Sequence, residues 1–347
     1  MPQLLLKTGF SAADRVLRGA AGSGFTGAVA RIEHKGNLLF EKAYGVTRDD
    51  GFAKPIYRDT LFDLASLTKL FVATCALEAV CDERISLDES LAGWLAEWRG
   101  TEHEAITLRM LLAHICGMDS GADYRELLGD NVVHHALHWP LVAEPGERVI
   151  YSDLGFIALG ELLQRAYARA LDCIVASSFE SVVYRPAADL WENIPATEDD
   201  GWRGRVQGQV HDEKAHLMGG VAGHAGLFGT ARDVAAMAER YLGPLHGRTS
   251  PLPSHIVKEA IREQADDAIL RRGLGWALKT SDENSCGRWF SRSSFGHTGF
   301  VGTCIWADPE RDLNAVLLTN SVYFGRADTR DLRAAFYEAA IEDLDLK

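Results

Sequence analysis

The segment Ser66-Leu67-Thr68-Lys69 holds the residue types of a nucleophile and its base. A serine hydroxyl is a weak nucleophile that needs a neighbouring base. The apolar run 71–80 predicts a helix that opens at this segment, and residues i and i+3 share a helix face, so the Lys69 amine can reach the Ser66 hydroxyl. The N-terminal end of that helix would direct backbone N–H groups at an oxyanion formed beside Ser66. The spacing therefore predicts an acyl-transfer nucleophile.

Two further segments carry side chains suited to the same chemistry. Tyr151-Ser152-Asp153 precedes a periodic run over 154–170 that predicts a helix. A tyrosine beside a cation can take or relay a proton, although Tyr151 could instead pack on the helix with Asp153 as its N-cap. In His297-Thr298-Gly299, on a strand-like segment, the glycine would let a substrate backbone approach closely and the other two side chains offer hydrogen-bond donors.

The surrounding patterns predict the elements that bring these segments together. Strands are expected as a hairpin over Gly27–His34 and 37–44, and then over 273–279, 303–307 and Leu313–Thr319. Helices are expected over 9–22, 71–80, 87–98, 108–112, 154–170, 231–241 and 328–341. Residues 186–213 are interpreted as a long loop, and 243–254, with three prolines, as a surface connection.

Strands at both ends of the chain therefore flank a helical middle. This order predicts an α+β fold in which both termini build one antiparallel sheet and a helical subdomain is inserted between its strands. The expected units are 1–70 plus 205–347 for the sheet and 71–204 for the mainly helical insertion, with the active site between them.

Composition limits the partners and the compartment. Among 347 residues, 36 Lys and Arg stand against 49 Asp and Glu, a net charge of −13, which disfavours nucleic acid and anionic membrane surfaces. The three leucines within residues 1–7 are too few for the hydrophobic region of a secretory signal, and no small-residue cleavage site follows. No stretch approaches about 18 uninterrupted apolar residues, so no transmembrane helix is expected. The six cysteines lack C-x-x-C spacing, which indicates buried thiols in a reducing compartment. We expect a cytoplasmic protein that acts on a small molecule, with its oligomeric state open.

The order S-x-x-K, Y-x-D and H-T-G resembles the penicillin-recognising serine hydrolases, specifically the class C β-lactamase-like esterases and D-peptidases. The glycine-rich segment 219–228 and Leu111-Leu112-Ala113-His114-Ile115-Cys116-Gly117 resemble two further segments of that family. The resemblance covers nearly the whole chain and implies a β-lactamase/transpeptidase-like fold.

The resemblance also implies roles for individual residues. Ser66 would be the acylated nucleophile, Lys69 would activate it, and Tyr151 would pass the proton to the leaving group and later to water. The backbone N–H groups of Ser66 and Phe300 would form the oxyanion hole, and His297 and Thr298 would contact the substrate. No metal and no organic cofactor is implied.

Two departures from the β-lactamase pattern shape the expected substrate. His297 stands where those enzymes usually have lysine, and a neutral imidazole that changes charge near about pH 6.5 attracts a carboxylate less than an ammonium does. That favours esters or small amides over β-lactams. Asp153 stands where they have asparagine, and its carboxylate would raise the pKa of Lys69 and make the amine a poorer base. We therefore expect the proton-accepting role to lean on Tyr151.

His211-Asp212-Glu213, with His216 and His224 nearby, could be taken for a metal cluster, but the spacing fits no standard zinc frame and favours hydrogen bonding. Whether His224 lines the pocket is left open. The leading hypothesis is a serine hydrolase that forms an acyl-enzyme with small esters or amides. The alternatives are a D-alanyl-type carboxypeptidase or D-aminopeptidase, and a slowly deacylating penicillin-recognising sensor.

Overall fold

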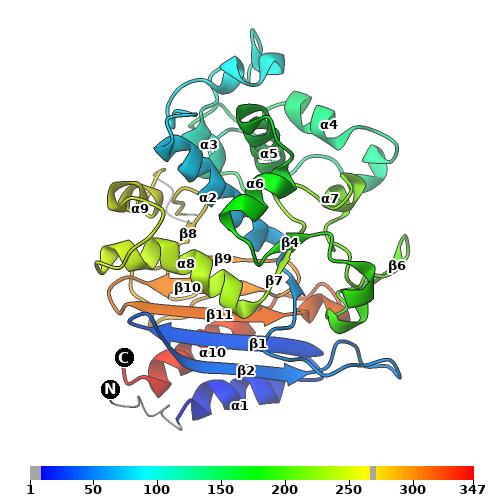
Figure 1. Ribbon diagram of the computed structural model, residues 1–347, viewed down its shortest axis with the longest axis vertical. Helices are drawn as coiled ribbons and strands as arrows, with labels where there is room; N and C mark the ends of the chain where they lie inside the picture. Colours follow the sequence, from blue (N-terminus) through cyan, green and yellow to red (C-terminus); the bar gives the residue numbers. More distant parts are fainter. Residues whose placement is uncertain (1–8, 266–270) are drawn as a thin grey trace.

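The fold is built on a six-stranded antiparallel sheet formed from both ends of the chain. The computed structural model describes residues 9–265 and 271–347. The order across the sheet is β2-β1-β11-β10-β9-β8 (Figure 1). The bounds are β1 Gly27–His34, β2 Asn37–Gly45, β8 Ala277–Leu278, β9 Phe295–Thr298, β10 Cys304–Asp308 and β11 Leu313–Thr319.

The central strands are apolar on both faces because both faces of the sheet are covered. β1 pairs with β11 so that Ala30 lies opposite Leu317. Leu317 belongs to one hydrophobic cluster and its neighbour Leu318 to the other, as alternation along a strand requires. This explains why all seven residues of β11 are buried.

Helices from the chain ends cover one face of the sheet, and the rest of the protein covers the other. α1 (Ser11–Ala20) and α10 (Arg330–Asp343) pack together at the bottom of the view in Figure 1. α8 (Ala231–Leu245) packs on the opposite face, against β1, β10 and β11. The helices of the middle segment stand beyond it (Figure 1).

The middle of the chain is mainly helical, with α2 at its centre. α2 (Thr68–Cys81) is almost wholly buried and contacts α5 and α6. The other helices are α3 Leu108–Leu112, α4 Val132–His138, α5 Asp153–Tyr167, α6 Leu171–Ser178, α7 Glu213–Leu217 and α9 Ser254–Ala260. The short strands β3 Phe62–Asp63, β7 Leu227–Gly229 and β4 Val183–Tyr184 form a second sheet, and β5 Asp199–Asp200 pairs with β6 Gly204–Arg205.

The predicted α+β architecture, with one antiparallel sheet from both termini and helices inserted between its strands, is confirmed. The helix predicted over 108–112 is present with these bounds, and the predicted hairpin 27–44 and the helices 9–22, 71–80, 231–241 and 328–341 are present with shifted ends. The unit boundaries near residues 70 and 205 stay a prediction.

The helix predicted over 87–98 is wrong. Two 3₁₀ turns, Leu91–Gly93 and Ala96–Trp98, occupy that region. Ser90 accepts a hydrogen bond from the N–H of Ala92, and the N–H of Leu91 donates to Ile106 O. The apolar spacing is helical, but these local and long-range hydrogen bonds divert the backbone from an α-helix.

The surface connection predicted over 243–254 is also partly wrong, because α8 continues to Leu245 and α9 begins at Ser254. Pro244 lies inside α8 and cannot donate to the carbonyl of Arg240. The hydroxyl of Ser250 donates to that carbonyl at 2.7 Å instead. The side chain thus replaces the hydrogen bond that the proline removes.

Three other expected elements differ in extent. The helix expected over 154–170 ends at Tyr167, because Ala168 adopts a left-handed conformation, and α6 then follows. The expected loop 186–213 contains a 3₁₀ helix, Ala188–Asn193, and the β5–β6 hairpin. The strand expected over 273–279 shrinks to β8, because Gly275 turns the chain with a φ of +81°.

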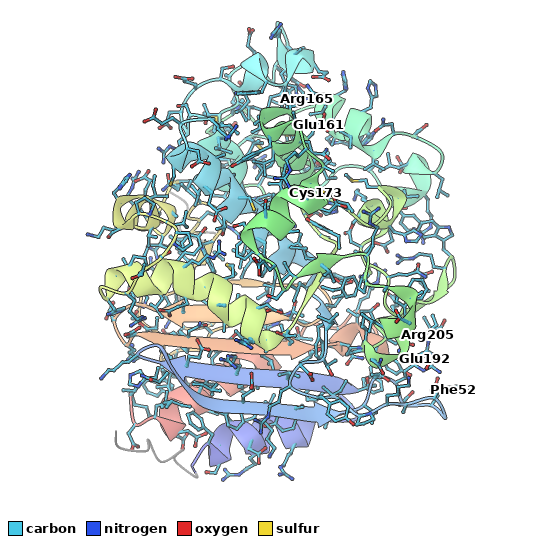
Figure 2. All side chains as sticks on the ribbon, in the orientation of Figure 1. Phe52, Glu161, Arg165, Cys173, Glu192 and Arg205 are labelled. Atoms are coloured by element: carbon cyan, nitrogen blue, oxygen red, sulfur yellow. The ribbon has the colours of Figure 1, made fainter. Side chains whose placement is uncertain are left out.

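The six cysteines are free thiols, as predicted. Four are buried, Cys81 is intermediate, and Cys173 is exposed on α6 (Figure 2). No helix in the described parts of the chain has both the length and the apolar character needed to cross a bilayer. The sequence reading of residues 1–7 lies outside the described residues, and a cytoplasmic location stays a prediction.

Candidate active site

The nucleophile candidate Ser66 lies in a 3₁₀ turn, Ala65–Leu67, that leads directly into α2. Ala65 has a φ of +46°, a left-handed conformation that costs a residue with a side chain about 1–2 kcal/mol. The buried carboxylate of Asp63 accepts the N–H of Ala65 at 2.8 Å and the N–H of His211 at 2.6 Å. Asp63, which the sequence analysis did not single out, thus holds the strained turn that presents Ser66.

Lys69 is buried next to Ser66, as the i, i+3 spacing predicts. Its Nζ donates to Ser66 Oγ at 3.0 Å, to Asp153 Oδ1 at 2.8 Å and to the carbonyl of His224 at 3.1 Å. These contacts use all three N–H bonds of an ammonium. Burial alone would lower the pKa of Lys69, but the charges and hydrogen bonds of Asp153 and Tyr151 outweigh it and raise the pKa well above its ordinary value. Lys69 is therefore an ammonium.

Tyr151 is the second partner of the nucleophile. Its hydroxyl donates to Ser66 Oγ at 2.9 Å, and Lys69 Nζ lies 4.9 Å from its ring centroid. The ring of His114 stacks on Tyr151 at 4.6 Å, and His114 Nδ1 accepts the N–H of Ser152 at 3.0 Å. His114 thus fixes both the ring and the following backbone of Tyr151. The sequence offered it only as part of a resembling segment.

Ser152, and not Asp153, caps α5. The Ser152 hydroxyl accepts the N–H of Gly155 at 2.8 Å, so the alternative with Asp153 as N-cap is wrong. The Asp153 carboxylate is directed to Lys69 instead. Burial would raise the pKa of Asp153, but the Lys69 charge outweighs it and lowers the pKa below its ordinary value. The two side chains form a buried ion pair.

Gly299 lies where β9 ends beside the nucleophile turn. A Cβ at this position would lie 2.0 Å from Thr303 Oγ1 and 2.8 Å from Leu64 O, so only glycine fits. Thr303 Oγ1 itself donates to Leu64 O at 3.1 Å. The close packing sets Phe300 next to the turn of Ser66, and neither backbone N–H of these two residues donates a hydrogen bond within the described chain. Both N–H groups are therefore available to an oxyanion.

His297 is buried on β9 and is neutral. Its Nδ1 donates to the carbonyl of Thr298 at 2.8 Å, which leaves Nε2 as an acceptor without a partner in the described residues. Burial, and then the charges of Arg272 and Lys69, lower the pKa of His297 well below its usual value. The expectation that this ring changes charge near pH 6.5 is therefore wrong. Thr298, next to it, lines the cavity that Ser66 also lines, and its contact with a substrate stays a prediction.

His224 contributes its carbonyl, and not its ring, to the site. The glycine-rich segment can bring this carbonyl to Lys69 because Gly223 packs against α5, where a Cβ would lie 1.9 Å from Phe156 O. The buried His224 ring hydrogen-bonds through Nε2 to Asp212 Oδ1 at 2.8 Å. The sequence left open whether this ring lines the pocket. Because the ring is buried and bonded to Asp212, it does not line the cavities at Ser66.

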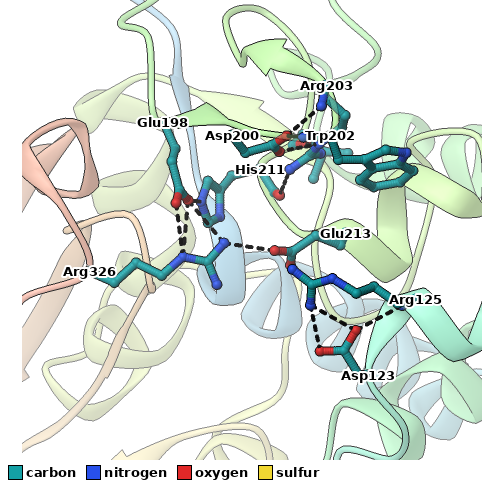
Figure 3. A network of polar contacts seen from close by, with 10 residues as sticks. Asp123, Arg125, Glu198, Asp200, Trp202, Arg203, His211, Glu213 and Arg326 are labelled. Atoms are coloured by element: carbon teal, nitrogen blue, oxygen red, sulfur yellow. Dashed lines mark hydrogen bonds and ion pairs between the residues drawn. The ribbon is translucent and has the colours of Figure 1, made fainter.

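The rim beside Phe300 is a network of charged side chains (Figure 3). Arg326 lies 3.0 Å from Glu198 and 2.7 Å from Glu213, and its guanidinium lies 5.5 Å from the ring centroid of Phe300. His211 hydrogen-bonds to Glu198 at 2.6 Å. The histidine and acidic residues of the segment 211–213 therefore form hydrogen bonds, as predicted.

Two cavities share part of their lining, and the smaller one reaches Ser66. The smaller, about 280 Å³, is lined by Ser66, Phe300 and Arg326 among others. The larger, about 760 Å³, is lined by His297 and a group of arginines. Tyr151 and Thr298 line both cavities. A substrate bound at Ser66 can therefore extend in two directions.

The fold and the Ser66–Lys69–Tyr151 cluster are those of a penicillin-recognising serine hydrolase. The chain belongs to the beta-lactamase family, whose model matches residues 13–340. It is 29% identical over 362 residues to an Escherichia coli O157:H7 protein named "Putative D-alanyl-D-alanine carboxypeptidase", covering 91% of this chain and 83% of that protein. It is 26% identical over 353 residues to the N-acetylmuramyl-L-alanine amidase of Bacillus subtilis (strain 168), and the match covers 88% of this chain and 80% of that protein.

Solved structures with the same fold include EstCE1, described as a hydrolase with promiscuous acyltransferase activity. It has a TM-score of 0.74 at 20% identity, over 94% of this chain and 97% of that one. A class C beta lactamase from Rhodobacter sphaeroides has a TM-score of 0.74 at 19% identity, and the match covers 96% of this chain and 99% of that one. These likenesses confirm the predicted β-lactamase/transpeptidase-like fold.

Proposed function

We propose that this hydrolase cleaves esters or amides of small molecules through an acyl-enzyme on Ser66, with Tyr151 as the proton carrier. The observation that carries the assignment is the position of Lys69. All its N–H bonds are used and its pKa is raised, so it cannot take a proton from Ser66. Tyr151, 2.9 Å from Ser66 Oγ, is the other group within reach.

In the acylation step, Ser66 Oγ forms a bond to the substrate carbonyl carbon. The Ser66 proton is relayed through the Tyr151 hydroxyl, which hydrogen-bonds to Ser66 Oγ, while the Lys69 ammonium stabilises the negative charge that develops on Ser66 Oγ. The carbonyl oxygen becomes an oxyanion that accepts hydrogen bonds from the N–H groups of Ser66 and Phe300. When the bond to the leaving group breaks, Tyr151 returns the proton to the departing oxygen or nitrogen.

In the deacylation step, the same groups act on water. Tyr151 accepts a proton from the attacking water and returns it to Ser66 Oγ as the acyl–oxygen bond breaks. The products are a carboxylic acid and the free enzyme. The neutral His297 supports an ester or simple amide rather than a β-lactam, because it offers no charge to a substrate carboxylate.

A D-peptidase is the second candidate, because the Escherichia coli relative carries a D-alanyl-D-alanine carboxypeptidase name. Such an enzyme releases an amino acid whose carboxylate must be recognised near the scissile bond. Recognition of that carboxylate requires a cationic side chain in the cavity.

Intact mass spectrometry with a fluorophosphonate and, separately, a penicillin tests the proposal. We expect one fluorophosphonate adduct on Ser66 that is absent from Ser66→Ala. Steady turnover of a 4-nitrophenyl ester, lost in the same variant, supports the hydrolase. Labelling at another residue overturns the mechanism, and a stoichiometric burst without turnover identifies the slowly deacylating sensor instead.

A further inference from the structure

The helix α4 carries a histidine-rich segment that the chemistry at Ser66 does not use. Its residues Val132–His138 include His134, His135 and His138, three of the twelve histidines of the chain. α4 lies at the outer side of the helical part of the molecule (Figure 1), and none of its histidines lines the two cavities beside Tyr151. Imidazole is the commonest protein ligand of metal ions. The placement of each ring decides whether this helix can hold one.

His134 and His138 share one face of α4. Residues i and i+4 lie one turn apart on a helix, and helical side chains lean toward the N-terminus, so the ring of His138 reaches back to the ring of His134. The two ring centroids are 4.1 Å apart, and the ring planes are 33° apart. Both residues are exposed, so an ion can reach them from solvent. The same i, i+4 spacing lets two helical histidines bind one zinc ion in H-E-x-x-H enzymes.

A backbone hydrogen bond determines which nitrogen of His138 is free. Its Nδ1 atom lies 2.8 Å from the carbonyl oxygen of His134. Because a carbonyl only accepts, Nδ1 carries the proton, and the lone pair of the neutral ring is on Nε2. Metal-binding histidines usually donate their second ring nitrogen in this way, which fixes the tautomer and the ring orientation. His138 therefore already has the supporting contact of a metal ligand.

The nitrogens that would face an ion have no protein partner in the described part of the chain. Neither ring nitrogen of His134 forms a hydrogen bond or an ion pair there, and neither does Nε2 of His138. His135 differs, because its ring packs on Trp139 with the ring centroids 4.6 Å apart, and its Nε2 atom is buried. The exposed pair is therefore His134 and His138, without His135.

The backbone that carries the pair is held firmly. Buried side chains anchor the inner face of α4. The carbonyl of Leu137 accepts a hydrogen bond from Trp98 Nε1 at 3.0 Å, and Trp139 Nε1 donates to Asp119 Oδ1 at 2.8 Å just after the helix ends. A rigid element loses little conformational entropy when a ligand binds. Only the two exposed rings need to adjust to an ion.

We propose that His134 and His138 together bind one transition-metal ion from solvent, Cu²⁺ in preference to Ni²⁺. In the described residues no third histidine, cysteine, aspartate or glutamate completes a metal-holding group with them, so water fills the remaining positions. Cu²⁺ binds nitrogen ligands most tightly among the first-row divalent ions and accepts a square-planar set of nitrogen and oxygen ligands. Structural zinc takes four protein ligands, and Ca²⁺ and Mg²⁺ take oxygen ligands, so the pair disfavours these ions. The site is separate from the hydrolase cavities, and binding there does not require Ser66.

Titration of the full chain with Cu²⁺ and with Ni²⁺ tests the site. All proteins carry Cys173→Ser, which removes the exposed thiol. One equivalent of Cu²⁺ should give an electron paramagnetic resonance spectrum with coupling to two imidazole nitrogens, and calorimetry should show one Ni²⁺ site with weaker affinity. Mg²⁺ should compete with neither ion. His134→Gln and His138→Gln should each lose the two-nitrogen coupling and weaken both affinities about 10-fold or more, since even loss of a supporting contact costs about this much.

His135→Gln is the matched control, because it removes a histidine of the same helix whose Nε2 atom is buried. It should keep the two-nitrogen coupling and the wild-type affinities. Circular dichroism of the metal-free variants verifies that each is folded, and the two exposed positions test the site independently. Absence of a Cu²⁺ site with two imidazoles, its retention in both His134→Gln and His138→Gln, or an equal loss in His135→Gln would overturn the proposal.

Discussion

The Lys69 ammonium lies 2.8 Å from Asp153 Oδ1 and 3.0 Å from Ser66 Oγ, so a buried ion pair lies directly against the nucleophile. Class C β-lactamases, which the sequence resembles, usually have asparagine in place of Asp153. The carboxylate fixes Lys69 in its charged form. In the proposed mechanism Lys69 is therefore an electrostatic stabiliser and Tyr151 transfers the proton.

Asp153→Asn tests that assignment. Without the carboxylate, burial lowers the pKa of Lys69, which frees the amine to act as a base. If Tyr151 is the base, kcat/KM for an ester should fall about 10-fold or more, because Lys69 loses its charge and its anchor. A rise in kcat/KM at pH 7 would instead identify Lys69 as the proton acceptor. Measurement of kcat/KM against pH for the wild type and for Asp153→Asn distinguishes these two outcomes.

Tyr151→Phe removes the proton carrier and leaves the ring that stacks on His114. We expect the acylation rate to fall about 100-fold or more, the usual contribution of general acid–base catalysis. Rapid-mixing measurement of the acylation burst separates this step from deacylation. Tyr44→Phe is the control, since Tyr44 bonds to Asp14 on the far side of the sheet. Near-normal acylation in Tyr151→Phe contradicts the proposed role.

His297→Gln should leave the shape of the pH profile unchanged between about pH 5.5 and 8, even where it lowers the rate. The pKa of His297 lies well below its ordinary value of 6.5, so the neutral ring is present throughout this range and gains a proton only at lower pH. Measurement of kcat/KM against pH for both enzymes checks this. Loss of an inflection near pH 6.5 in the variant would show that the ring titrates there.

Glu198→Gln should make stability less sensitive to acid. Hydrogen bonds from His211, then from Arg326, outweigh the opposing effect of burial and lower the pKa of Glu198 from 4.5 to about 2 in the folded state. A lowered pKa stabilises the fold above about pH 4.5, and this contribution is lost as the pH falls toward 2. The Tm difference between the wild type and Glu198→Gln should therefore be largest near pH 7 and shrink as the pH falls from about 4.5 toward 2.

Glu192→Gln is the matched control for Glu198. The Glu192 side chain is 75% exposed, and its ion pair with Lys54 lies on the surface (Figure 2). Exposed pairs contribute little to stability. A Tm difference for Glu198→Gln that is equal at pH 7 and pH 3 would contradict the ionic origin of its effect.

The sequence predicted the reacting groups because their spacing is local or their order is distinctive. Ser66 and Lys69 are set by one helical turn, and Tyr151 by the start of α5. The antiparallel sheet could be predicted from the hairpin pattern near the start of the chain and from the short apolar or alternating runs near its end. Such features depend on residues close together in the sequence, or on a family pattern.

What the sequence missed depends on contacts between distant segments. Asp63 holds the nucleophile turn to the segment of His211, and His114 reaches across to stack on Tyr151. Arg272 meets Tyr151 only once β8 is added to the edge of the sheet. No local pattern in the sequence marks these pairings, because a single aspartate, histidine or arginine is an equally ordinary residue on the protein surface.

Gly299→Ala should disable the enzyme through the oxyanion hole. The new Cβ would lie 2.0 Å from Thr303 Oγ1 and 2.8 Å from Leu64 O, so the end of β9 must move and carry the N–H of Phe300 with it. Loss of one oxyanion donor typically lowers kcat about 100-fold. Gly93→Ala, where the added carbon meets no atom within 4 Å, is the control. Ester turnover and Tm together decide the outcome. Unchanged kcat in Gly299→Ala would show that the N–H of Phe300 does not stabilise the oxyanion.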